Sequence, residues 1–127
     1  MKDNIIATKS EDFAVRIINL SEYMLQNNPS KNIQSLSNQI LRSGTSIAAN
    51  IAESKYAQSK NDLITKLSIS LKEASETSMW LRLLNRTKYI SDDQYNSLHN
   101  NIDELIRMLT ASIKTLKTNN SNSKLLK

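Results

Sequence analysis

Few residues in this chain are of a type and spacing that could do chemistry. The single histidine, His99, has Asn96 three residues before it, so it lacks the Glu-x-x-His pattern with which helical bundles hold a di-iron site. Glu73 and Glu76 place two carboxylates at i and i+3, but no second pair of this kind faces them. We therefore expect no metal and no other cofactor. His99 is interpreted as a solvated surface histidine.

Composition excludes several other catalytic designs. The 127 residues contain one Gly, one Pro and no Cys. Disulfides, thiol nucleophiles and zinc-thiolate sites need Cys, and dinucleotide or P-loop sites need several glycines. Serine is abundant, but no Gly-framed turn presents a nucleophilic serine. The sequence therefore predicts that the protein is not an enzyme.

The scarcity of Gly and Pro also disfavours sandwiches and barrels, which need frequent turns. Hydrophobic periodicity instead predicts four helices, over residues 11–26, 32–55, 60–86 and 91–117. Short connections favour antiparallel neighbours, so the expected fold is all-α, an antiparallel up-down-up-down four-helix bundle. Residues 1–10 are expected to be a flexible N-terminus, and residues 118–127 a short disordered basic tail.

Local signals support these helix boundaries. Ser10 is interpreted as the N-cap of the first helix, and Ser59–Asp62 and Ser91–Gln94 resemble capping boxes before the last two. The third helix carries an unbroken heptad seam, which consists of Leu63, Leu67, Ser70, Ala74, Thr77, Leu81 and Leu84.

A ridge of small residues lies beside the apolar stripe of the second helix. Gly44, Ala48 and Ala52 are each four residues apart. Glycine inside a helix costs about 1 kcal/mol relative to alanine. The ridge therefore favours close packing at a place where another backbone comes near, and the alternative is a tolerated defect.

Two further groups of residues lie away from the expected core. On the second helix they are Arg42, Ser46, Asn50 and Glu53; on the third they are Ile69, Glu73, Glu76 and Trp80. Because Trp and Arg are enriched at interface centres, these groups suggest an oligomer interface in which Arg42 pairs with Glu73 or Glu76 across a subunit boundary. The alternative is a tryptophan that covers the core edge among solvated acids.

The basic charge is unevenly distributed. The formal net charge is +5, and residues 114–127 hold four lysines and no acid, so the rest of the chain is nearly neutral. Basic residues of the middle segments and the last helix are candidate nucleic-acid contacts. They are Lys55, Lys60, Lys66, Lys72, Arg82, Arg86, Lys114 and Lys117.

The stretch from Gln39 to Glu53, QILRSGTSIAANIAE, resembles the signature of the bacterial 23S ribosomal RNA intervening-sequence proteins. Lys66-Leu67, the segment 71–77 and Trp80-Leu81 resemble the third helix of that family. The resemblance covers about residues 10–117. It implies a bundle that assembles into a ring of five subunits, without catalytic residues, whose biochemical role is unassigned.

The same resemblance implies a distant relationship to the accessory protein of diversity-generating retroelements, a basic pentamer that binds nucleic acid and a reverse transcriptase. The nearly neutral body of this chain departs from that strongly basic relative. Two functions are therefore expected: a homo-oligomeric accessory protein that binds RNA or DNA, or an assembly module whose partner is a protein encoded nearby. No apolar run of signal-peptide or membrane-spanning length occurs, so the expected location is the cytoplasm, without membrane contact.

Overall fold

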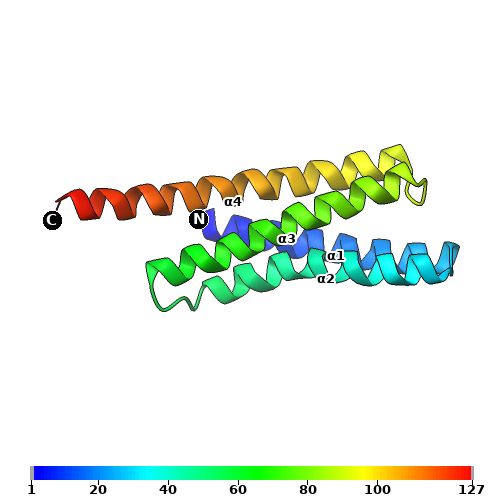
Figure 1. Ribbon diagram of the computed structural model, residues 1–127, viewed down its shortest axis with the longest axis horizontal. Helices are drawn as coiled ribbons and strands as arrows, with labels where there is room; N and C mark the ends of the chain where they lie inside the picture. The colour runs from blue at the N-terminus through cyan, green and yellow to red at the C-terminus, as the bar shows by residue number, and fades with distance from the viewer. Residues whose placement is uncertain (1, 127) are drawn as a thin grey trace.

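The structure is a computed structural model that describes the backbone of residues 2–126 and the side chains of residues 5–119. It consists of four helices, α1 (Lys2–Asn27), α2 (Lys31–Ser54), α3 (Lys60–Arg86) and α4 (Asp92–Leu126). The chain reverses direction at each short connection (Figure 1). Contacts join α1 to α2, α2 to α3, α3 to α4 and α4 to α1, so α1 and α3 occupy opposite corners. The expected all-α four-helix bundle is confirmed.

Side-chain caps determine where the last three helices begin. Ser30 Oγ accepts a hydrogen bond from Ile33 N at 3.2 Å at the start of α2, and Ser59 Oγ accepts one from Asp62 N at 3.0 Å at the start of α3. At the start of α4, Ser91 Oγ accepts from Gln94 N at 3.1 Å while Gln94 Oε1 accepts from Ser91 N at 2.8 Å. This reciprocal pair is the predicted capping box.

The first helix begins earlier than the sequence suggested. α1 begins at Lys2, and Ser10 lies inside it with no exposed surface, where its Oγ donates to Ala7 O at 2.8 Å. Ser10 is therefore not an N-cap, and the prediction of a flexible N-terminus is wrong for residues 5–10. The physical reason is Ile6, which lies seven residues before Phe13 and is buried in the same core. That burial extends the apolar seam by two turns.

Residues 120–127 lie outside the side chains that the structure describes. α4 continues past the expected end at Lys117, and Thr118 Oγ1 donates to Lys114 O at 2.9 Å. We predicted a disordered basic tail over residues 118–127. Because the side chains beyond residue 119 are not described, this stays a prediction there.

The core combines branched aliphatic side chains with small buried hydroxyls. Six of the seven predicted seam residues of α3 are buried, and Leu63 is half-buried. Ser70 Oγ donates to Ile47 O at 2.9 Å, and the Ser43 and Thr77 hydroxyl oxygens lie 2.9 Å apart, so both contacts link α2 to α3. Small side chains with satisfied hydroxyls allow these two helices to lie close together.

Gly44 of α2 lies directly against the Ile17 side chain of α1. A Cβ atom at this position would lie 2.8 Å from Ile17 Cγ2 and 3.0 Å from Ile17 Cγ1. The space beside Gly44 is thus filled closely by a side chain of α1, whereas the ridge was predicted to face another backbone. The ridge ends there, because Ala48 is half-buried and Ala52 is exposed.

We predict that Gly44→Ala destabilises the chain. Overpacking of a core costs about 1–3 kcal/mol, which exceeds the gain of about 1 kcal/mol in helix propensity. In an Ile17→Ala background the new methyl group has room, so the same substitution becomes stabilising. Urea unfolding midpoints of the four chains measure this reversal of sign. Asn38→Ala, at an exposed position of α2, is the control and has the same effect in both backgrounds. Stabilisation by Gly44→Ala alone would contradict the prediction.

Candidate functional site

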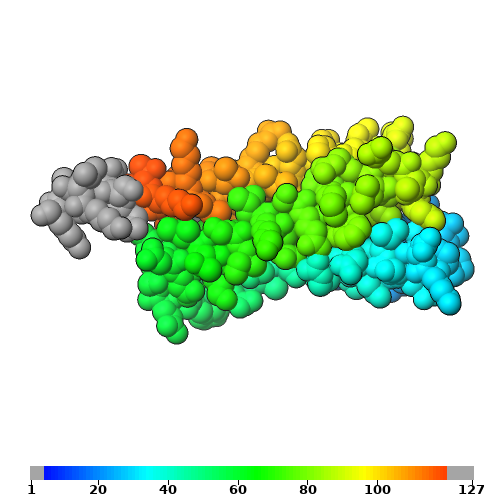
Figure 2. Space-filling view, viewed as in Figure 1, coloured from blue at the N-terminus to red at the C-terminus, as the bar shows by residue number. Residues whose placement is uncertain are grey.

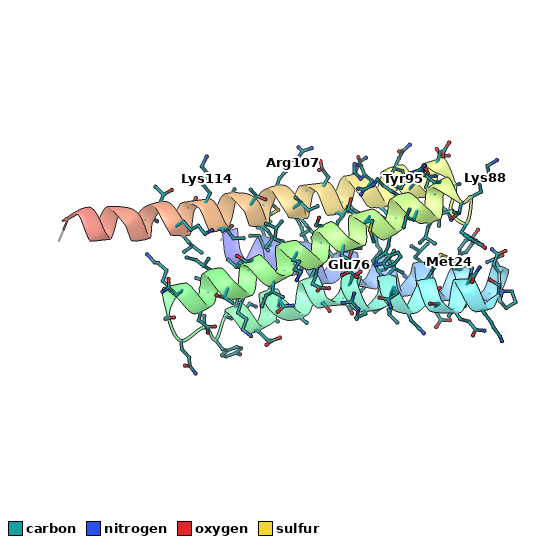
Figure 3. The ribbon with its side chains drawn as sticks, viewed as in Figure 1. Met24, Glu76, Lys88, Tyr95, Arg107 and Lys114 are labelled. Carbon is teal, nitrogen blue, oxygen red and sulfur yellow. The ribbon has the colours of Figure 1, made fainter. Side chains whose placement is uncertain are left out.

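A cluster of charged and aromatic side chains joins α2 to α3 midway along the bundle. Arg42 Nη1 lies 3.1 Å from Glu73 Oε2, and its other terminal nitrogen donates to Glu76 Oε2. Trp80 Nε1 donates to the same Glu76 oxygen at 3.0 Å. Figure 3 shows Glu76 on α3 where this helix passes α2. One guanidinium therefore holds two carboxylates, and one of these also positions the indole.

Helix geometry explains why these residues meet. Glu73, Glu76 and Trp80 follow one another at steps of three and four, which places them on one face of α3. The side chains of Glu73 and Glu76 are 16% and 31% exposed, whereas that of Arg42 is 51% exposed. The flexible arginine stem reaches from the outer side of α2 to this face, and the open side of its guanidinium remains in water.

This geometry corrects one expectation. The hypothesis placed the partners of Arg42 on another subunit, whereas the structure pairs Arg42 with both glutamates of its own chain. The reason is that α2 and α3 are adjacent, so their flanking faces meet at the surface of the bundle. Arg42 thus links α2 to α3 on the surface of a single bundle.

The remaining signature residues of α2 contribute less to this surface. Ser46 Oγ donates to Arg42 O at 2.6 Å, and Asn50 Nδ2 donates to Ser46 O at 2.8 Å, so both side chains bond to their own helix. Glu53 instead reaches α3, where its Oε1 lies 3.2 Å from Lys66 Nζ. Ile69 is exposed one helical turn before Glu73.

The candidate nucleic-acid contacts do not form one continuous patch. Lys55 and Lys60 flank the connection between α2 and α3, whereas Arg82 and Arg86 lie near the opposite end of α3. Lys72 is exposed midway, and Lys66 is engaged by Glu53. Lys114 and Lys117 are exposed on α4, and Lys114 projects away from the bundle (Figure 3). The α2–α3 connection therefore holds Lys55 and Lys60 at one end of α3, whereas Arg82 and Arg86 lie toward the other end.

Sequence reasoning missed Tyr56. This residue lies in the α2–α3 connection between Lys55 and Lys60, and it is 85% exposed. The available signal was an aromatic residue between lysines in a segment without helical periodicity, SKYAQSK. An exposed aromatic ring beside cations is the arrangement on which nucleic-acid bases stack.

His99 departs from the interpretation as a solvated surface residue. It is half-buried, and its ring stacks on Tyr95 with the ring centroids 5.3 Å apart. Its Nδ1 atom is buried and has no hydrogen-bond partner among the described residues. Because the His99 ring stacks on Tyr95, one helical turn earlier, its role here is in packing.

No helix in the described part of the chain has both the length and the hydropathy that crossing a bilayer requires.

Comparison with known proteins now identifies the family. The family model described as 23S rRNA-intervening sequence protein matches residues 2–111. The chain belongs to this family. A crystal structure from Bacteroides thetaiotaomicron, described as a protein with unknown function from the S23 ribosomal protein family, superposes with a TM-score of 0.85. It is 50% identical, and the match covers 90% of this chain and 99% of that one. No curated protein matches the chain.

The family match begins at residue 2, in agreement with the early start of α1. It includes Arg42, Glu73, Glu76 and Trp80, and it ends before Lys114 and Lys117. The α2–α3 cluster therefore lies within the family domain, and the last two candidate lysines lie outside the matched region.

We predict that Glu76→Ala changes the fluorescence of Trp80, the only tryptophan, more than Glu73→Ala does. Each variant removes one partner of Arg42, but only Glu76 also accepts the indole N–H. Both variants should cost less than about 1 kcal/mol in unfolding free energy, because the Arg42 pairs are half-exposed. Emission spectra and urea titrations measure the two effects. Equal spectral changes in both variants would show that the Trp80 hydrogen bond is absent in solution.

Proposed function

We propose that this protein is a non-catalytic, homo-oligomeric accessory protein that binds nucleic acid at the end of the bundle formed by the α2–α3 connection. The observation that carries the proposal is the 85% exposed ring of Tyr56 between Lys55 and Lys60. Neither lysine forms an ion pair with any side chain that the structure describes. Both cations are therefore free to meet phosphates while the ring stacks on a base.

The way in which acidic side chains are used supports this assignment. Among the side chains that the structure describes, five acids form ion pairs: Glu53, Glu73, Glu76, Asp103 and Glu104. Asp62 accepts from Gln58 N at 3.1 Å, and Asp92 accepts from Asn85 Nδ2 at 2.9 Å. Lys55 and Lys60 are not among the cations used in these pairs, so both remain available to an approaching polyanion.

The resemblance to the retroelement accessory protein favours nucleic acid over a protein partner, and a ring would multiply the modest charge of each subunit. The polar clusters also have structural roles, in helix caps, ion pairs and bonds to helix carbonyls, which supports a function in binding rather than in catalysis. Residues 2–111 carry the family match, so the proposed site at Lys55–Lys60 lies within the family domain.

We predict that the protein binds labelled single-stranded RNA or DNA in a salt-dependent manner. Lys55→Ala/Lys60→Ala should reduce the slope of log Kd against log salt by about 1.4, since each phosphate contact to a single strand contributes about 0.7. Tyr56→Ala should weaken binding by about 1–3 kcal/mol, the contribution of one stacked base. Fluorescence anisotropy across a salt series measures both quantities.

Lys31→Ala/Lys88→Ala is the matched control, because it removes the same charge from exposed positions at the opposite end of the bundle. Its slope should equal that of the natural chain. A chain ending at Lys117 measures the contribution of the C-terminal lysines. If micromolar protein binds neither RNA nor DNA near physiological salt, the proposal is wrong. A specific protein that co-purifies despite nuclease treatment would then support the assembly module.

A further inference from the structure

The outer face of α1 carries a short apolar seam between two acidic residues. Val15 and Ile18 are 55% and 45% exposed, although Ile17 beside them is fully buried. Glu11, Val15, Ile18 and Glu22 follow one another at steps of four, three and four, so they form one line that points away from the core. Both glutamates are exposed, and neither has an ion-pair partner among the described side chains. We call this line the α1 seam.

The outer face of α3 carries a second seam with the opposite charge at its borders. Its residues follow steps of three and four: Ile69, Lys72, Glu76, Met79, Leu83 and Arg86. Ile69 and Leu83 are 38% and 39% exposed. Glu76 is neutralised by Arg42, whereas no described side chain forms an ion pair with Lys72 or Arg86. Figure 2 shows the outer face of α3 uncovered between α2 and α4. We call this line the α3 seam.

The two seams cannot meet within one chain. α1 and α3 occupy opposite corners of the bundle and do not contact each other. Each helix already buries one seam in the core, and each displays a second one on its outer side. Apolar residues at heptad-like steps with charged borders are the pattern by which helices pair side by side. Neither seam therefore has a helical partner within its own chain. Only another molecule can supply one.

We infer that the α1 seam of one molecule packs against the α3 seam of a second copy of the same chain. Glu11 and Glu22 would then face Lys72 and Arg86, and Val15 and Ile18 would cover Met79 and Leu83. The occupant is a second copy because the charge pattern of each seam complements the other seam of the same chain. Like seams brought together would oppose glutamate to glutamate or cation to cation.

Because the seams lie at opposite corners, this contact is head-to-tail rather than two-fold. A heterologous contact of this kind closes into a ring or continues as a filament. The inference rests on the homo-oligomer in the proposed function and specifies its contacts. It also gives the Arg42 cluster a role, since that cluster removes the charge of Glu76 from the middle of the α3 seam.

Charge reversal tests the inference in the full-length chain. Glu11→Lys/Glu22→Lys and, separately, Lys72→Glu/Arg86→Glu should each reduce the mass measured by light scattering toward the 14.4 kDa of one chain. A chain with all four substitutions restores complementarity, so it should recover the mass of the natural assembly. Circular dichroism confirms that each variant folds, which these exposed positions allow.

Lys31→Glu/Lys88→Glu is the matched control, because it makes the same charge change on exposed residues outside both seams. It should leave the natural mass unchanged. A natural chain that scatters as a monomer at tens of micromolar overturns the inference. So does an assembly that survives both double reversals, or a fourfold variant that stays monomeric while folded.

Anisotropy with labelled single-stranded RNA separates this inference from the proposed function. For this comparison Val15→Ser/Ile18→Ser removes the exposed apolar side chains of the α1 seam and leaves the charge unchanged. If this variant is dissociated and still binds through Tyr56 and its lysines, with at least tenfold weaker apparent affinity, the seams and the nucleic-acid site are supported together. An assembled natural chain that obeys the reversal pattern but binds neither RNA nor DNA supports the seams and refutes the proposed function. Equal affinity in the dissociated and natural chains would refute the contribution of assembly to binding.

Discussion

The contact between Gly44 and Ile17 determines how α1 lies on α2. The Ile17 side chain occupies the space that a Cβ at residue 44 would need, so α1 can neither rotate nor slide without losing this fit. Successive helical residues differ by 100°, and a rotation of one residue would therefore turn Val15 and Ile18 away from their present direction. A packing contact in the interior thus fixes the direction of two exposed apolar residues on the outside.

The sequence predicted the features that follow from local periodicity. The four helices, the buried heptad seam from Leu63 to Leu84 and the capping box Ser91–Gln94 all depend on spacing within one segment, and the structure has them. The start of α1 was missed because Ser10 reads as a cap. The structure shows Ile6 buried in the core, so α1 begins before Ser10. Ser10 itself is then a buried residue inside the helix.

The pairing of Arg42 and the exposure of Tyr56 required the structure. A helical-wheel projection shows which face of α2 carries Arg42. The partner that its long side chain reaches depends on how α2 and α3 pack. Tyr56 lies in a connection, where no period indicates which side chains are exposed. The candidate lysines were chosen by charge alone, and Lys66 shows the limit of that criterion, because Glu53 engages it.

The buried hydroxyls have a thermodynamic consequence. Within residues 5–119, seven serine and threonine residues are buried, among them Ser10, Ser43, Ser70 and Thr77. Exposure of apolar surface raises the heat capacity on unfolding, whereas exposure of polar surface lowers it. A core in which hydroxyls replace methyl groups therefore gives a smaller heat-capacity change than an all-aliphatic core of the same length. The stability of this bundle should consequently vary gently with temperature, and its cold denaturation should be displaced to lower temperature.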